Sequence, residues 1–139
     1  KVPETAVKSI EKALKTTASN TGLQFHIALN YGSRAEITRG VRKLCESVRS
    51  GTLAPEDIDE KIISESLYTG AENGSVPDPD LIIRTSGELR ISNFWLWQGS
   101  YSEYYFTDTL WPDFGAAELK KALQSYAGRE RRYGRVEEF

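Results

Sequence analysis

The stretch that decides the fold is residues 81–93, which read Leu81-Ile82-Ile83-Arg84-Thr85-Ser86-Gly87-Glu88-Leu89-Arg90-Ile91-Ser92-Asn93. Its first three residues are an apolar run bounded by turn residues, as in a short buried strand of a parallel sheet covered on both faces. A polar cluster follows this strand directly. Because open α/β sheets bind ligands beyond the carboxyl ends of their strands, we expect a ligand site here.

The residue types in this cluster suit a phosphate group. Arg84 and Arg90 offer fixed pairs of N–H donors to phosphate oxygens. Gly87 lets the backbone approach closely, and Ser92 can cap a helix whose free N–H groups attract anions. Together these residues predict a diphosphate site. The alternative, which spacing leaves open, is that the arginines form ion pairs with Glu88, Asp80 or Glu103.

The residues before the cluster predict two helices and a strand. Apolar spacings of three and four predict an amphipathic helix over residues 4–18. Strict alternation of apolar and polar residues from Leu23 to Asn30 predicts a half-buried strand. A long helix is expected to begin at Ser33, because Glu36 follows three residues later as in a capping box.

The remaining residues continue the alternation of helices and strands. A shorter helix begins near Pro55 and ends at Gly70. Beyond the strand at 81–83 we expect a short aromatic helix from about Ser92, a strand near 104–106 and a final helix over 115–131. This order predicts an α/β fold with a mostly parallel central sheet flanked by helices.

Composition excludes several classes of protein. The chain has 139 residues, the size of one domain, and 18 basic against 20 acidic residues, so it has no general attraction for nucleic acid or anionic lipid. Cys45 is the single cysteine, so no intrachain disulfide can form, and we expect it in a helix core. No apolar run approaches the ~20 residues of a membrane-spanning helix. His26 has no Cys/His cluster beside it, so we expect it to be a strand residue and neither a base nor a metal ligand.

The residues around the polar cluster continue in a distinctive order, from Pro79-Asp80 through 81–94 and Leu96-Trp97-Gln98 to Glu103, Tyr105-Phe106 and Leu110-Trp111-Pro112-Asp113-Phe114. This order resembles the signature of the cis-prenyltransferase family, whose members make undecaprenyl, dehydrodolichyl and related polyprenyl diphosphates. The match runs over roughly 35 nearly continuous residues, far longer than a degenerate motif. Residues 27–34 are also similar to the family's strand-turn segment, with Ser33 in place of the more usual glycine.

The resemblance implies a fold and an activity. The fold is the cis-prenyltransferase fold, and the activity is prenyl chain elongation, in which isopentenyl diphosphate condenses with an allylic diphosphate to form a cis-polyprenyl diphosphate. The implied cofactor is Mg²⁺. The alternative is a non-catalytic partner subunit of a heteromeric cis-prenyltransferase, although such partners commonly lose the arginine-serine cluster that is intact here.

The resemblance also implies roles for individual residues. Arg84, Arg90 and Ser92 correspond to the family's ligands for the diphosphate of isopentenyl diphosphate. Glu103 corresponds to a carboxylate that helps to bind Mg²⁺, and its alternative role is a solvated surface glutamate.

The C-terminal segment carries a further implied element. Arg132 and Gly134 match an Arg-x-Gly element by which the family's C-terminus reaches diphosphate across a dimer interface. The alternative is that basic residues and a glycine simply end the last helix. The implied assembly is a homodimer or a heteromer with a related subunit, with peripheral membrane contact through the lipid product.

Aromatic residues are concentrated in residues 94–114. They could line a tunnel for the prenyl chain, but residues of this kind more often form core or a subunit interface, which is what we expect. They are Trp95, Trp97, Tyr101, Tyr104, Tyr105, Phe106 and Trp111.

The chain departs from the family pattern in two informative places. Leu89 stands where bacterial members often have histidine, and the sequence of residues 86–90 is similar to that of plant plastid-type members. We therefore expect an intracellular protein, located in the plastid, in the cytosol or at a membrane surface. No Asp-Gly-Asn motif is present, although the family's catalytic aspartate lies in one. We therefore expect residues 1–139 to be the C-terminal part of a single catalytic domain. We expect the N-terminal strand and helices of that domain to be missing from this chain, and the chain to be inactive alone.

Overall fold

A computed structural model of the chain describes residues 3–70 and 74–130. The chain divides into two units, residues 1–32 and residues 33–139. The first unit contains the helix α1, Glu4–Thr17, which confirms the predicted helix. None of its residues is buried, and Leu14 on its apolar face is 64% exposed.

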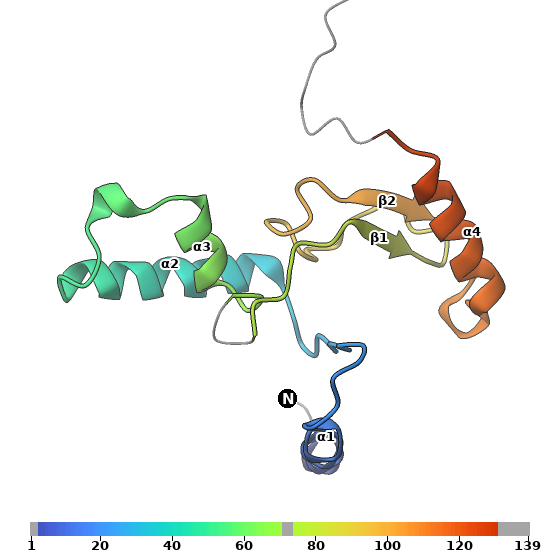
Figure 1. Ribbon diagram of the computed structural model, residues 1–139, viewed down its shortest axis with the longest axis horizontal. Coiled ribbons are helices and arrows are strands. Elements are labelled where there is room, and N and C mark those ends of the chain that lie inside the picture. Colours follow the sequence, from blue (N-terminus) through green and yellow to red (C-terminus); the bar gives the residue numbers. More distant parts are fainter. Residues whose placement is uncertain (1–2, 71–73, 131–139) are drawn as a thin grey trace, which may run out of the picture. The chain divides into compact units, whose positions relative to one another are not determined.

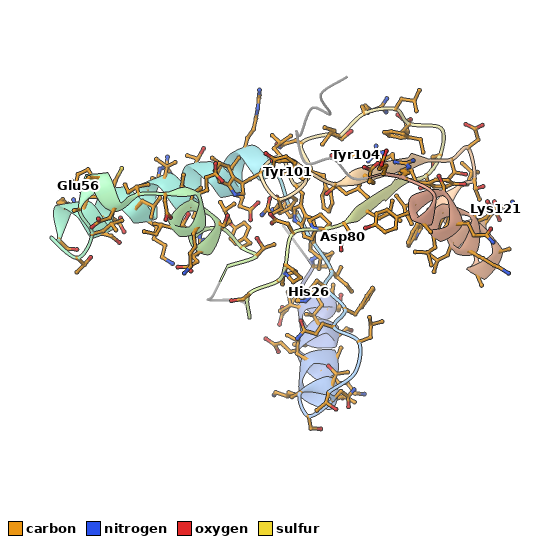
Figure 2. The ribbon with its side chains drawn as sticks, turned by 45° about the horizontal axis from the view of Figure 1, so that its top comes forward. His26, Glu56, Asp80, Tyr101, Tyr104 and Lys121 are labelled. Atoms are coloured by element: carbon orange, nitrogen blue, oxygen red, sulfur yellow. The ribbon has the colours of Figure 1, made fainter. Side chains whose placement is uncertain are left out.

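The strand predicted from Leu23 to Asn30 is wrong for the residues that the structure describes. Residues 21–30 form no strand, and the backbone of residues 23–29 makes no hydrogen bond to any described residue. The alternating side chains remain in solvent, with Leu23 94% and Phe25 80% exposed. Alternating apolar and polar side chains give a segment the two faces of a strand. A strand forms only when the backbone of another strand pairs with it, and the alternation does not show whether such a partner is present. His26 lies on this segment (Figure 2), exposed and away from any metal-ligating cluster among the described residues.

The second unit begins with a pair of helices. The long helix α2, Ser33–Arg49, begins at the predicted residue. The second predicted helix is broken into a short 3₁₀ turn, η1, Pro55–Asp57, and the helix α3, Glu60–Ser66. The break follows from local chemistry, because Asp59 takes an extended conformation and its side chain accepts a hydrogen bond of 2.8 Å from Ile62 N, which starts a new helix.

The helices α2 and α3 pack against each other (Figure 1). Gly40 lies at the closest approach, where an added Cβ would be 2.7 Å from Ser66 Oγ and 3.2 Å from Leu67 Cδ2. Arg39 crosses the same contact and places its guanidinium 4.8 Å from the centre of the Tyr68 ring. The glycine therefore sets how closely the two helices can lie.

The predicted parallel sheet is confirmed. Its strands are β1, Leu81–Arg84, and β2, Glu103–Phe106, which pair in parallel with Leu81 opposite Glu103 and Arg84 opposite Phe106. Both strands are half-buried, with Phe106 exposed, so the sheet is less covered than the apolar run predicts. After the 3₁₀ turn η3, Trp111–Asp113, the helix α4, Ala116–Ala127, packs against β2 (Figure 1).

The short aromatic helix predicted from Ser92 is absent. Residues 92–101 form a series of turns in which Ser92, Asn93 and Trp95 have φ angles of 53°, 61° and 43°. These are left-handed conformations, which a right-handed helix cannot contain. The conformation depends on contacts with α2, which the local pattern of residues does not reveal.

The buried interior of the described residues is small and largely polar. Leu67 and Ala122 are its buried apolar residues, and the buried polar residues are Ser33, Glu36, Ser66 and Gln98. Cys45 is exposed on α2, so its predicted place in a helix core is wrong. Among the described residues no helix combines the length and the apolar character needed to cross a membrane.

Candidate anion-binding site

The predicted ligand cluster lies at the carboxyl end of β1. Arg84, the last residue of the strand, and Arg90 both line a cavity of about 230 Å³. Arg84 Nη2 donates a hydrogen bond of 3.4 Å to Ser92 Oγ, which brings the third predicted residue to the same place. The other lining residues are apolar or aromatic: Ile82, Ile83, Ile91, Phe94, Tyr104 and Phe106. The cavity therefore combines two cations with apolar walls, and the Ser92 hydroxyl contacts one of these cations.

The loop after β1 turns sharply at Ser86 and Gly87, which both have φ of 68°. Their backbone N–H groups donate to the carbonyls of Thr109 and Thr107, each at 2.9 Å, so this loop is fastened to the segment that follows β2. A Cβ at Gly87 would lie 3.0 Å from Asp108 Oδ1. Both the left-handed conformation and this close approach favour glycine.

The ion-pair alternative holds for one of the two arginines. Arg90 pairs with Glu88, and their side chains are 66% and 34% exposed. An exposed pair of this kind contributes about 0–1 kcal/mol, so Arg90 can exchange Glu88 for a more highly charged anion at little cost. Arg84 forms no salt bridge within the part of the chain that the structure describes.

The segment after the arginines is fastened to the start of α2. Ser33 N donates to Asn93 O at 2.8 Å, and Arg34 N donates to Asn93 Oδ1 at 2.9 Å. In the opposite direction, Leu96 N donates to Ser33 Oγ at 3.0 Å. Sequence reasoning missed the part played by Asn93. The available signal was weak, since asparagine tolerates the left-handed conformation better than most residues.

Glu103 does not lie with the arginines. It begins β2 opposite Leu81, whereas Arg84 lies opposite Phe106, three residues or about 10 Å farther along the strands. Its carboxylate is paired with the Arg129 guanidinium at 2.7 Å, and the two side chains are 27% and 32% exposed. It is therefore neither a freely solvated glutamate nor part of the cluster at Arg84.

The oxygen ligands of Glu103 suit Mg²⁺ chemically but do not build a complete site. The described residues contain no group of three or more His, Cys, Asp or Glu side chains placed to hold a metal. Mg²⁺ commonly uses one or two carboxylates together with water and substrate phosphates. Glu103 thus fits the role of one ligand in a shared site, with the other ligands supplied from elsewhere.

Two other predicted features have different outcomes. Arg132 and Gly134 lie outside the described residues. The aromatic residues of 94–114 differ in their surroundings. Tyr104 and Phe106 line the arginine cavity and stack with their ring centres 5.9 Å apart, whereas Trp111 is 73% exposed. Tyr104, labelled in Figure 2, lies on β2.

A larger cavity, of about 580 Å³, lies along α2, η1 and α3. Its lining is apolar except for Cys45, Arg49 and Ser66. One arginine at the edge of an apolar hollow offers no convergent donors for a diphosphate, so the smaller cavity beside Arg84 and Arg90 remains the candidate site.

Comparison with known proteins places the chain in a family. The family model described as "Putative undecaprenyl diphosphate synthase" matches residues 1–134. The chain is 50% identical over 138 residues to an isoprenyl transferase of Porphyromonas gingivalis, covering 99% of this chain and 53% of that protein. It is also 50% identical over 135 residues to an isoprenyl transferase of Geobacillus kaustophilus, covering 97% of this chain and 51% of that protein. The chain thus spans about half the length of the relatives that it matches.

Solved structures give the same result for the fold. The structure of lavandulyl diphosphate synthase from Lavandula x intermedia, in complex with dimethylallyl diphosphate, matches with a TM-score of 0.90 and 42% identity, covering 97% of this chain and 56% of that one. A probable undecaprenyl diphosphate synthase from Campylobacter jejuni matches with a TM-score of 0.76 and 29% identity, covering 97% and 59%. The chain belongs to the undecaprenyl diphosphate synthase-like family of prenyltransferases.

Proposed function

We propose that the protein containing this chain elongates prenyl chains, condensing isopentenyl diphosphate with an allylic diphosphate to form a cis-polyprenyl diphosphate, and that Arg84, Arg90 and Ser92 bind the diphosphate of isopentenyl diphosphate. One observation carries the proposal. In a chain that is 50% identical to isoprenyl transferases, two arginines line a cavity at the carboxyl end of a parallel strand, and one of them, Arg84, bonds the Ser92 hydroxyl.

The cavity matches both parts of such a substrate. The guanidinium groups present forked N–H donors, which form paired, charge-assisted hydrogen bonds to phosphate oxygens. Ser92 Oγ accepts from Arg84, so its own hydroxyl hydrogen is left to point at an anion. The apolar walls from Ile82, Phe94 and Tyr104 suit a hydrocarbon group and exclude water, which strengthens every charged contact inside.

The assignment of Glu103 as a Mg²⁺ ligand also remains part of the proposal. Bound Mg²⁺ would stabilise negative charge on a departing diphosphate. The ion pair with Arg129 supports the assignment to this extent: a partly covered carboxylate already holds one cation, so it can exchange that cation for another. The proposed role of Arg132 and Gly134, contacting diphosphate across a subunit boundary, rests on the resemblance alone.

The proposed assembly is a homodimer or a heteromer with a related subunit, within which residues 1–139 form the C-terminal part of one catalytic domain. The exposed apolar side chains of α1 and of residues 23–29 support further packing partners, because large exposed apolar areas usually mark interaction surfaces. We expect this chain alone to be inactive, since the catalytic aspartate of the family has no counterpart in it. Membrane contact through the lipid product and an intracellular location, in the plastid or the cytosol, also remain proposals.

The alternative function is that of a non-catalytic partner subunit. The cluster of Arg84, Arg90 and Ser92 favours the enzyme, because a subunit that binds no substrate has no use for two arginines beside one cavity. The two functions make different predictions for purified protein.

The test is incorporation of radiolabelled isopentenyl diphosphate by the full-length protein, with an allylic diphosphate and Mg²⁺. We expect products longer than the allylic primer, and no products when Mg²⁺ is removed by a chelator. A parallel reaction with dimethylallyl diphosphate alone, the ligand named for the lavandulyl diphosphate synthase structure, tests for coupling without isopentenyl diphosphate. Absence of incorporation by the full-length protein, with and without a related subunit, would contradict the enzymatic proposal.

A further inference from the structure

A fully buried serine at the start of α2 contacts the ligand loop from a distance in the sequence. Ser33 has 0% exposure, and its Oγ accepts from Leu96 N, 63 residues away. Two further bonds run beside this one, from Ser33 N to Asn93 O and from Arg34 N to Asn93 Oδ1. We call these three hydrogen bonds the α2 clasp.

The segment held by the clasp needs outside support. Ser92, Asn93 and Trp95 are all left-handed, a conformation that serine and tryptophan rarely keep without support from the surrounding structure. Ser92 immediately precedes the clasped residue, and its Oγ is the atom that Arg84 contacts. The direction in which this hydroxyl points therefore depends on how Asn93 is held.

The clasp has a rigid base farther along the same helix. Glu36 is fully buried, and its Oε1 accepts from Tyr68 N at 2.7 Å and from Gln98 Nε2 at 3.2 Å. Gln98 Nε2 also donates to Thr69 Oγ1 at 3.0 Å. Both ends of the 93–98 segment are thus fastened to α2 or to the residues after α3, so the segment has little freedom to move on its own.

We propose that Ser33 and Asn93 are positioning residues of the diphosphate site: through the α2 clasp they hold Ser92 Oγ beside Arg84 and the cavity that Arg90 shares. This inference rests on the proposed function and extends it to a residue on a helix that does not line the cavity. Ser33 Oγ is the acceptor for Leu96 N, and a residue without a side-chain oxygen could not take its place. The Oγ contact therefore depends on this chain's own serine.

The test uses two variants of the full-length protein and a matched control. Ser33→Ala removes the acceptor for Leu96 N and changes little volume. Asn93→Gly removes the acceptor for Arg34 N and keeps a residue that adopts the left-handed conformation without strain. Ser47→Ala is the control, because Ser47 lies on the same helix and its Oγ donates within that helix, to Lys43 O at 3.2 Å.

The expected result is a change in one Michaelis constant. Each clasp variant raises the KM for isopentenyl diphosphate about tenfold, the loss expected when a partly buried donor is left unpaired beside a binding site. The kcat and the KM for the allylic diphosphate stay within about twofold of the wild-type values, because a positioning effect on one substrate's ligand does not touch the other substrate. Ser47→Ala leaves all three constants unchanged.

Other outcomes separate the clasp from the proposed function. If Arg90→Ala raises the KM for isopentenyl diphosphate but neither clasp variant does, the clasp is not a positioning device and this inference fails alone. A fall in kcat together with a higher KM for both substrates and a lowered midpoint of thermal unfolding would show a merely structural role and would also overturn it. If Arg90→Ala leaves that KM unchanged, the proposed diphosphate site is wrong, and the inference falls with it; the enzymatic proposal itself fails only if the full-length protein incorporates no isopentenyl diphosphate.

Discussion

Single residues at the carboxyl end of β1 decide what this site can bind. Arg84 forms no ion pair among the described residues, and Arg90, itself exposed, has a half-buried partner in Glu88. Their positive charge is therefore available to a ligand, although the chain as a whole carries a formal charge of -2. Affinity for an anion at this place comes from local geometry and not from overall charge.

Replacing Arg90 tests this directly. We expect Arg90→Ala in the full-length protein to raise the KM for isopentenyl diphosphate by about tenfold or more, because a charge-assisted hydrogen bond contributes about 1.5–3 kcal/mol. The KM for the allylic diphosphate should change much less. Arg42→Ala, which removes an exposed arginine from α2, is the control and should behave as the wild type. Equal losses for the two substrates would contradict the assignment.

Glu103 gives a second prediction at this scale. Arg129 holds its carboxylate at 2.7 Å, so a metal ion has to displace the guanidinium. Arg129→Ala removes this competitor, and we expect the Mg²⁺ concentration that gives half-maximal activity to fall several-fold. Lys121→Ala breaks the ion pair with Glu118 on α4 and should leave the Mg²⁺ titration unchanged. A titration that shifts toward higher Mg²⁺, or does not shift, would count against Glu103 as a ligand.

Helices and strands that depend on neighbouring residues could be predicted from the sequence. Segments whose conformation depends on residues far away in the sequence could not. The helices α1, α2 and α4 follow from apolar spacing, and β1 and β2 follow from short apolar or aromatic runs. The strand at 23–30 failed because no described residue pairs with its backbone, and the helix at Ser92 failed because Ser92, Asn93 and Trp95 are left-handed.

The same distinction holds for the candidate site. Arg84, Arg90 and Ser92 lie within nine residues of one another, so a reading of the chain could group them. The contact of Arg34 N with Asn93 Oδ1 joins residues 59 positions apart, and no local pattern indicates it. Likewise, the position of Glu103 at the other end of the sheet became clear only from the register of the two strands.

The unpaired segment at residues 23–29 supplies a prediction for an element. Because its backbone makes no hydrogen bonds to described residues, we expect its amides in this 139-residue chain to exchange with deuterium within seconds. The amides of β1 and β2 that bond across the sheet are the internal comparison and should exchange more slowly. Slow exchange over 23–29 in this chain would show that the segment is paired in solution.

At the scale of the whole molecule, stability depends on pH through Asp78, which lies in the loop before β1. Partial desolvation raises the pKa of this carboxyl. The folded chain therefore binds its proton more tightly than the unfolded chain, whose aspartate titrates near pH ~4. This tighter proton binding stabilises the folded chain. The contribution is fully present below the pKa of the unfolded chain and is lost as the pH rises through the raised pKa of the folded chain. The effect is small, because the residue is still exposed.

Asp78→Asn makes this dependence measurable. We expect the variant to unfold at a slightly higher temperature than the wild type at pH 7, where the carboxylate of the wild type is charged, and at nearly the same temperature below about pH 4. Asp57→Asn, at an exposed position on η1, is the control for loss of one negative charge. A difference that grows toward acid pH would have the wrong sign.

The α2 clasp bears on whether residues 81–98 can bind an anion when they are separated from the rest of the chain. Residues 81–98 contain both arginines and Ser92, yet the atoms that hold the turn belong to Ser33 and Arg34. A synthetic peptide of residues 81–98 should therefore bind inorganic pyrophosphate no better than a scrambled peptide of the same composition, which calorimetry can measure. In this chain the contacts that hold Asn93 and Leu96 come from a helix that begins nearly sixty residues upstream, so residues 81–98 alone lack the support that keeps Ser92 beside Arg84.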